Sequence, residues 1–274
     1  MDERYADLSQ HLDIQASQGK IEAHWYGSKP DEAPTLVLLH EGLGCAQMWK
    51  EFPQQLAQQS HCGVLVYSRA GYGNSTSCAL PRPFPFMHHE ASQALPEILD
   101  LAGVKECILI GHSDGGSIAL LHAGLNPRRG LLGVVTLAAH LFVEALTLES
   151  IRAAKVAWET TDLRERLRRY HGDNVDCAFR GWNDVWLNPD FENWNIEGCL
   201  AGIKVPVLAI QGVDDQYGTV EQIDRIVAGT GASKRMLANC AHSPQLEQTQ
   251  ATLEAIVDFT GKLTGHIPRQ ACKL

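Results

Sequence analysis

The sequence predicts an α/β protein with a mainly parallel, doubly wound sheet and a helical insertion. Apolar runs of strand length alternate with segments of helical spacing along most of the 274 residues, which is the pattern of a parallel sheet with helices on both faces. Several of these runs are apolar at every position, as expected for strands that are buried on both faces. The alternation stops between residues 140 and 203, which indicates an insertion between two strands.

The spacing of apolar residues predicts the following strands and helices along the chain. In the first half, two short strands flank Gln18-Gly19 within 11–26, strands are expected at 35–39 and 63–67, and helices at 48–59 and 87–101, the second bent at Pro96. In the second half, strands at 107–110, 131–138, 205–210 and 234–237 alternate with helices at 116–122, 219–227 and 245–263. The predicted core therefore consists of residues 1–139 and 204–274.

Residues 140–203 are predicted to form a helical cap over the carboxyl edge of the sheet. Two amphipathic helices and an aromatic, strand-poor stretch are expected there, at 148–159, 162–170 and 179–194. Trp182 and Trp186 are expected either to line a substrate pocket or to hold the cap together. A segment of about 60 residues is marginal for folding alone, which favours a cap over an independent domain.

The composition excludes several classes of partner. A balance of 23 basic and 32 acidic residues gives a formal charge of −9, and no basic block offers a surface for nucleic acid. No apolar run approaches the ~20 residues of a membrane span, and the polar start at 1–4 lacks the layout of a signal peptide. The 8 cysteines include no C-x-x-C pair for a metal or a redox couple, so free thiols are expected. These features predict a cytoplasmic protein without a metal, nucleic-acid or membrane partner, acting on a small molecule, and they leave the oligomeric state open.

The string Gly111-His112-Ser113-Asp114-Gly115 follows an apolar strand and enters a helix-forming segment. In a strand–turn–helix of this kind the glycines allow a tight turn, and the strained turn lifts the serine oxygen above the sheet. Ser113 is therefore the candidate nucleophile.

A serine nucleophile needs a general base and a carboxylate that orients the base. His242 lies on the loop between the last strand and the last helix, at the same edge of the sheet as Ser113. The alternatives are His122, His140 and His171. Asp214 and Asp215 both follow a buried strand, and either could reach the imidazole.

Backbone N–H groups are needed to stabilise the transition-state oxyanion. One is expected from Asp114, at the start of a helix whose dipole favours negative charge. The other is expected from the loop His40-Glu41-Gly42-Leu43-Gly44, whose glycines let the backbone approach the substrate. Either Leu43 or Gly42 is the second donor.

Together these motifs resemble the α/β-hydrolase superfamily. Besides the elbow and the oxyanion loop, the resemblance rests on Ser68-Arg69-Ala70-Gly71-Tyr72-Gly73-Asn74-Ser75, Gly212-Val213-Asp214-Asp215 and Ala241-His242-Ser243-Pro244. Ser113-Asp114-Gly115-Gly116 is similar to valacyclovir hydrolase-like esterases, and meta-cleavage-product hydrolases are a more distant likeness. The resemblance implies an α/β-hydrolase fold and favours Asp215 as the acid, with Asp214 as the alternative. Glu41 stands where a glycine is common in the superfamily.

The expected activity is cleavage of a carboxylic ester or related acyl bond, in which Ser113 attacks, His242 carries the proton and Asp215 orients His242. Alternatives on the same scaffold are a carbon–carbon bond hydrolase, a lactonase or a thioesterase, and, from another class, a non-catalytic receptor. No cofactor is implied, because no dinucleotide, phosphate or metal motif stands out. Asp114 and Glu41 are expected to face the substrate, and the resemblance links the aspartate after the serine to recognition of a substrate α-amino group.

Overall fold

The computed structural model describes residues 10–265, so the polar start at 1–4 and Cys272 lie outside the described residues. Within that range eight strands form one sheet in the order β1-β2-β4-β3-β5-β6-β7-β8. The strands are β1 (Gln10–Ala16), β2 (Gly19–Gly27), β3 (Thr35–Leu39), β4 (Gly63–Tyr67), β5 (Cys107–His112), β6 (Leu131–Leu137), β7 (Val207–Gly212) and β8 (Ser233–Leu237). β1 and β2 form an antiparallel hairpin, β2 is antiparallel to β4, and all other neighbours are parallel. The predicted mainly parallel sheet is confirmed.

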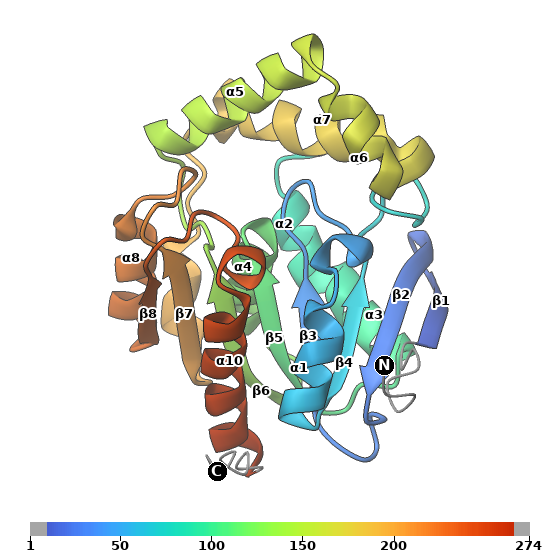
Figure 1. Ribbon diagram of the computed structural model, residues 1–274, viewed down its shortest axis with the longest axis vertical. Helices are drawn as coiled ribbons and strands as arrows, with labels where there is room; N and C mark the ends of the chain where they lie inside the picture. Colours follow the sequence, from blue (N-terminus) through green and yellow to red (C-terminus); the bar gives the residue numbers. More distant parts are fainter. Residues whose placement is uncertain (1–9, 266–274) are drawn as a thin grey trace.

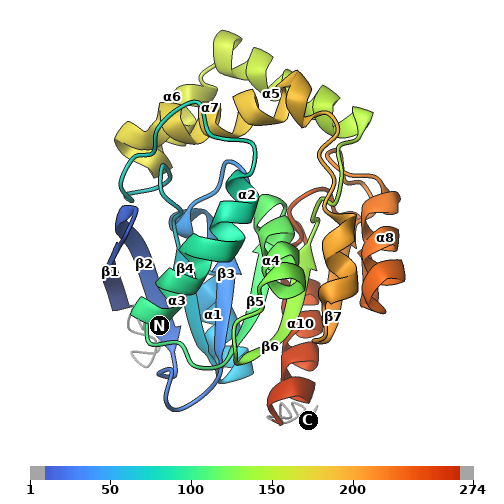
Figure 2. The same ribbon diagram turned by 180° about the vertical axis from the view of Figure 1, so that it is seen from behind.

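Helices cover both faces of the sheet (Figures 1 and 2). On one face lie α1 (Phe52–Ser60) and α10 (Thr249–Thr264), and on the other α3 (Leu95–Leu101), α4 (Asp114–Leu125) and α8 (Val220–Thr230). Successive residues of a central strand enter different cores: Val37 packs in the core beneath α4, and Leu38 in the core beneath α1 and α10. Since both faces are covered, β3, β4 and β5 are buried at every residue, as their continuous apolar runs predicted.

The helix expected at 48–59 begins later than predicted. A 3₁₀ turn at Ala46–Trp49 ends at Lys50, whose left-handed backbone (φ 53°) interrupts any continuous helix. α1 then starts at Phe52, with Pro53 in its first turn, where a missing N–H is tolerated.

Two other helices are interrupted. The helix expected to bend at Pro96 consists of α2 (Phe86–His89), a π turn at Glu90–Ala94 and α3, with Pro96 in the first turn of α3. The closing helix expected at 245–263 is divided into α9 (Pro244–Glu247) and α10, because Gln248 has ψ 52°, outside the helical region.

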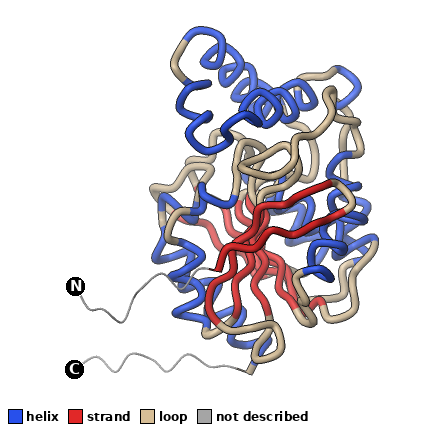
Figure 3. The backbone as a smooth tube through the Cα atoms, turned by 90° about the vertical axis from the view of Figure 1, so that its right-hand side faces the viewer, coloured by secondary structure: helices blue, strands red, loops and turns tan. Residues whose placement is uncertain are grey.

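The segment 140–203, called the cap below, carries three longer helices above the carboxyl ends of the parallel strands (Figures 1 and 3). They are α5 (Ala145–Thr160), α6 (Leu163–His171) and α7 (Val175–Trp186). α7 occupies part of the stretch that was predicted only as aromatic and strand-poor. The buried Phe179, Trp182 and Trp186 recur at helical spacing, so the signal was present in the sequence. No helix in residues 10–265 combines the length and the apolar character needed to span a membrane.

The cap is tied to the core by buried polar side chains. The Asn174 amide donates to the carbonyls of Gly73 (3.1 Å) and Ser75 (2.6 Å). His171 accepts from the Gly73 N–H (3.1 Å) and donates from Nε2 to the Leu43 carbonyl (3.0 Å). One histidine therefore joins the cap to the predicted oxyanion loop.

Candidate active site

Ser113 stands in a strained turn between β5 and α4, with φ 52° and ψ −118°. The turn has no room for a side chain two residues before or two residues after the serine. A Cβ on Gly111 would lie 2.1 Å from the Gly115 carbonyl oxygen, and a Cβ on Gly115 would lie 2.1 Å from the Leu39 carbonyl oxygen. The G-x-S-x-G spacing is therefore a steric requirement of this turn.

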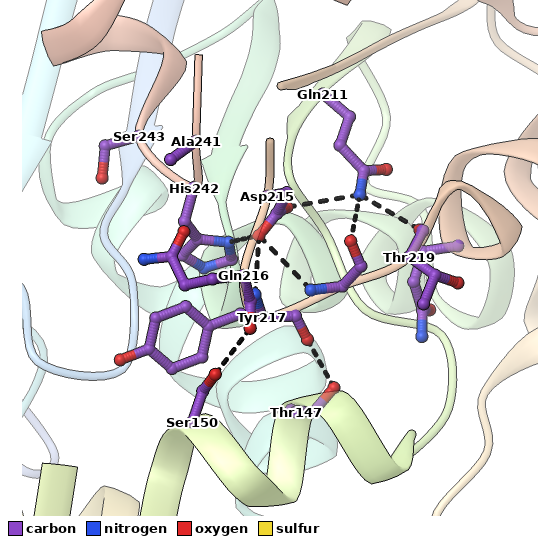
Figure 4. A network of polar contacts seen from close by, with 12 residues as sticks. Thr147, Ser150, Gln211, Asp215, Gln216, Tyr217, Thr219, Ala241, His242 and Ser243 are labelled. Carbon is purple, nitrogen blue, oxygen red and sulfur yellow. Dashed lines mark hydrogen bonds and ion pairs between the residues drawn. The ribbon is translucent and has the colours of Figure 1, made fainter. Parts of the chain in front are cut away.

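The acid loop after β7 brings Asp215 against His242 (Figure 4). His242 Nδ1 donates to Asp215 Oδ1 at 2.8 Å, and the same oxygen accepts the N–H of Tyr217 at 2.9 Å and of Gly218 at 3.3 Å. The Gln211 amide donates to Asp215 Oδ2 at 3.2 Å. Burial alone would raise the pKa of Asp215, but the hydrogen bond and charge of His242 outweigh it, so the pKa is lowered. Asp215 is thus held as a carboxylate that orients the imidazole.

Asp214, the alternative acid, lies differently. Asp214 is exposed, and its N–H donates to the Cys240 carbonyl at 2.9 Å. Within the described residues its side chain forms no hydrogen bond or ion pair. The structure therefore brings Asp215, and not Asp214, to His242.

The cap braces the acid loop, a feature that sequence reasoning missed. From α5, Thr147 Oγ1 donates to the Tyr217 carbonyl and Ser150 Oγ donates to the Gln216 carbonyl at 2.6 Å (Figure 4). These hydrogen bonds join segments that are about 70 residues apart in the sequence, so no local sequence pattern predicts them.

Ser113 and His242 line one cavity of about 160 Å³. Its roof comes from the cap, through Thr147, Ile151, Trp182 and Trp186. Across residues 10–265 the structure records no hydrogen bond between the Ser113 hydroxyl and His242. Hydrogen bonds of this kind often tighten only when substrate is bound.

The predicted oxyanion loop is held by its carbonyl groups. Arg69 donates to the carbonyls of His40 (2.6 Å) and Glu41 (3.0 Å), and His40 Nδ1 also donates to the Glu41 carbonyl (2.7 Å). The N–H groups of Gly42 and Leu43 have no recorded acceptor within the described residues. Both are therefore available to an oxyanion in the cavity, and the choice between them stays open.

The same loop packs directly under the cap. A Cβ on Gly42 would lie 2.1 Å from Trp182 Cδ1, so any larger residue would displace the indole ring. The glycine therefore lets the backbone of the oxyanion loop and a cap tryptophan share one cavity wall.

Glu41 lines the cavity, but its carboxylate contacts the protein. Glu41 Oε2 lies 3.2 Å from His112 Nδ1, and His112 Nε2 donates to the His242 carbonyl at 2.7 Å. Burial would lower the pKa of His112, but the hydrogen bond and charge of Glu41 raise it overall. Through His112, Glu41 connects the oxyanion loop to the histidine loop.

Asp114 is fully buried in the cavity wall. Its Oδ1 accepts the Trp186 indole N–H at 3.3 Å, whereas Oδ2 has no hydrogen-bond partner. Burial raises the pKa of Asp114 to about 6, and the positive charge of Arg69 offsets only part of that effect. Trp186, predicted either to line the pocket or to hold the cap, lines the cavity and also packs edge-on against Phe191 and Trp194 of the cap.

The three alternative histidines lie in other surroundings. His122 donates to the Ala91 carbonyl at 2.8 Å inside the core, and both ring nitrogens of His171 are occupied as described above. His140 lines the cavity, where burial and the neighbouring His242 lower its pKa to about 3, so it is a neutral wall residue. Across the described chain no three His, Cys, Asp or Glu side chains are grouped to hold a metal ion.

This chain is similar in sequence and in fold to several known proteins. Residues 36–255 match the model of the "Alpha/beta hydrolase family". The 2-hydroxy-6-oxo-6-phenylhexa-2,4-dienoate hydrolase of Comamonas testosteroni is 22% identical over 257 residues, covering 83% of this chain and 88% of that protein. A bacterial membrane phospholipase A superposes with a TM-score of 0.77 and 20% identity, over 93% of this chain and 87% of that one. An esterase from Thermogutta terrifontis superposes with a TM-score of 0.71 and 17% identity, over 93% and 99% of the two chains.

Proposed function

Because this chain belongs to the alpha/beta hydrolase family, as its motifs predicted, and has its fold, we propose that it cleaves a carboxylic ester or related acyl bond of a small molecule through an acyl-enzyme on Ser113. The similar proteins named above include a hydrolase and an esterase, which support hydrolysis as the general reaction. The bond that is cleaved and the acyl-enzyme mechanism are inferred from the chemistry of the cavity.

In the proposed acylation step, Ser113 Oγ attacks the substrate carbonyl carbon while His242 Nε2 accepts the serine proton. The Asp215 hydrogen bond to Nδ1 leaves Nε2 with its lone pair, and the Asp215 carboxylate stabilises the imidazolium. The carbonyl oxygen, now negative, accepts hydrogen bonds from the N–H groups of Asp114 and Leu43, with Gly42 as the alternative to Leu43. His242 then protonates the leaving alcohol.

In the proposed deacylation step, water replaces the alcohol and His242 removes its proton. The resulting hydroxide attacks the acyl carbon, and the same N–H groups stabilise the second oxyanion. The bond between the acyl carbon and Ser113 Oγ then breaks as His242 returns the proton to Oγ. The carboxylic acid product then departs beneath the cap.

One observation carries the proposal: a strained serine and an imidazole that is hydrogen-bonded to a buried carboxylate line the same cavity. A non-catalytic receptor would need none of these groups in this arrangement. The combination of nucleophile, base and orienting acid is what nucleophilic catalysis requires.

A substrate panel tests the reaction class. The cavity is close in size to a 150 Å³ cavity that accommodates benzene, so 4-nitrophenyl esters of short acids are expected to have kcat/KM at least about tenfold above esters of long acids. The panel also includes thioesters and lactones of matched acyl size. A preference for either of those over the matched ester would reassign the reaction.

Carbon–carbon bond hydrolysis is the rival within the family. The Comamonas relative is named for a dienoate, which is an anion. Here the Asp114 carboxylate lies in the cavity wall, with Oδ1 bonded to Trp186 and Oδ2 without a partner, and above a pKa of about 6 its charge would repel an anionic substrate. This feature favours a neutral or cationic ester.

Asp114 also supports a specific substrate class: esters with an ammonium group near the carbonyl. A buried carboxylate oxygen without a partner is unfavourable, and an ammonium group in the cavity would supply the missing hydrogen bond and charge. Asp114 follows the nucleophile directly, so this contact would lie on the acyl side of the substrate.

We expect an amino-acid ester to be preferred over its deaminated analogue, with a kcat/KM ratio that falls about tenfold or more in Asp114→Asn, since tenfold corresponds to about 1.4 kcal/mol. Asparagine retains the backbone N–H and an acceptor for Trp186. In the wild type the ratio should also fall between pH 7 and 5, because the Asp114 carboxylate, with a pKa of about 6, becomes protonated, while an α-amino group with a pKa of about 8 stays charged. If the kcat/KM ratio of the two esters is equal in the wild type and the variant, Asp114 does not bind the ammonium group and its role is structural.

A further inference from the structure

Two cysteines that are far apart in the sequence meet where the cap contacts the core. Cys78 lies on the loop after β4, and Cys177 lies in α7. Their sulfur atoms are 2.9 Å apart, and Cys177 Sγ also lies 3.4 Å from the Cys78 carbonyl oxygen. A disulfide bond would require the sulfurs to approach to about 2.05 Å. The two thiols are therefore already paired in space across the cap and the core.

A buried cation adjoins the thiol pair. A Cβ built on Gly71 would lie 2.6 Å from Cys78 Sγ, 2.8 Å from Cys177 Sγ and 2.6 Å from Arg82 Nη2, so the three groups surround one point. Arg82 is only 8% exposed, donates to the Ala70 carbonyl at 2.6 Å and leaves Nε without a partner. Within residues 10–265 no carboxylate forms an ion pair with Arg82. The charges of the buried Glu90 and Asp114 also act on Arg82, and a thiolate at either cysteine would be stabilised by the same guanidinium.

The surroundings make Cys177 the more acidic thiol. The hydrogen bond between the two sulfurs and the charge of Arg82 lower the pKa of Cys177, against the effect of burial, whereas the pKa of Cys78 is raised. Burial raises the pKa of every other cysteine in the described chain: Cys45, Cys62, Cys107, Cys199 and Cys240. Because the thiolate is the reactive form, oxidation is expected to select this pair.

We propose that Cys78 and Cys177 are a redox-sensitive thiol pair, which a peroxide converts to a disulfide that fastens the cap to the core. α7 also carries Trp182 and Trp186, which line the catalytic cavity. A covalent link from this helix to the core restricts outward movement of the cavity roof and slows the passage of substrate and product. The oxidation stands independently, and only its effect on turnover rests on the proposed function.

The chemistry balances with hydrogen peroxide as the oxidant. The Cys177 thiolate attacks one peroxide oxygen, an S–O bond forms, the O–O bond breaks, and hydroxide leaves and is protonated to water. The Cys78 sulfur then attacks the sulfenic sulfur of Cys177, the S–S bond forms, the S–O bond breaks, and the departing hydroxide takes the Cys78 proton as water. Two thiols are oxidised by two electrons, one peroxide is reduced to two waters, and a dithiol reductant reverses the link.

The test treats the full-length protein with a small excess of hydrogen peroxide and maps peptides by mass spectrometry without reduction. A peptide pair linked through Cys78 and Cys177 is expected in the wild type and in the control Cys199→Ser, a buried cysteine with no thiol partner. It should be absent from Cys78→Ser and Cys177→Ser, and dithiothreitol should remove it. A pair linked through other cysteines, or no linked pair, would overturn the proposal.

A second readout follows the cap. In the oxidised wild type, ester turnover should fall several-fold and recover with dithiothreitol, while Cys78→Ser should keep its rate after the same treatment. An unchanged rate in a fully linked protein would overturn the effect on the cap. If the linked peptide forms but reduced wild type cleaves no ester, the proposed function fails and the thiol pair stands.

Discussion

Replacing Ser113 with alanine is expected to lower kcat for the best ester by about 10⁴-fold or more, because the acyl-enzyme route loses its nucleophile. The side chain is small and its backbone geometry is set by the flanking glycines, so the melting temperature should change little. The measurement is steady-state hydrolysis together with a thermal melt of each protein.

Ser117→Ala is the matched control. Ser117 is a buried serine of α4 whose hydroxyl donates to the His140 carbonyl at 2.6 Å and lies 3.5 Å from the Ser113 carbonyl, so its loss removes backbone hydrogen bonds and leaves the nucleophilic hydroxyl in place. The control should lose some stability and keep most of its activity. A folded Ser113→Ala protein that still hydrolyses esters at the wild-type rate would contradict the proposed mechanism.

The second large effect is expected at the acid. Asp215→Asn should lower kcat by about 10²- to 10⁴-fold, because an amide in this position no longer selects the imidazole tautomer or stabilises the imidazolium. Asp214→Asn is the matched control, one residue away and exposed, and should stay within about twofold of the wild type.

The reverse order of effects would mean that Asp214 is the acid and that the acid loop rearranges during the reaction. Equal, small effects in both variants would mean that no carboxylate of this loop assists His242.

The elbow could be predicted from the sequence because its requirements are local. The glycines at 111 and 115 are needed by contacts within the turn and with the adjacent strand, and a strand–serine–helix order is visible in a short window. The alternation of strands and helices was equally local, which is why the sheet followed from apolar runs alone.

The choice between Asp214 and Asp215 could not be made from the residues themselves. Both follow β7, and which side chain turns inward depends on the N–H groups of Tyr217 and Gly218, which hold Asp215 Oδ1. Family resemblance favoured Asp215, and the contacts supply the physical reason.

Longer-range contacts account for what sequence reasoning missed. His112 reaches the His242 loop across 130 residues, and Arg69 holds the oxyanion loop from the loop after β4. Residue types suited to such roles are common in any chain, so only the folded arrangement distinguishes them. Cys78 and Cys177 are free thiols, as predicted, but their proximity could not be predicted for the same reason.

The most direct test of the central claim is to identify the residue that an active-site inhibitor modifies covalently. The protein is treated with a fluorophosphonate, which phosphonylates activated serines, and the modified peptide is located by mass spectrometry. We predict one adduct per chain, on Ser113, that is absent from Ser113→Ala and slowed in Asp215→Asn. An adduct on a different residue, or an active protein that forms none, would contradict the assignment of Ser113 as the nucleophile.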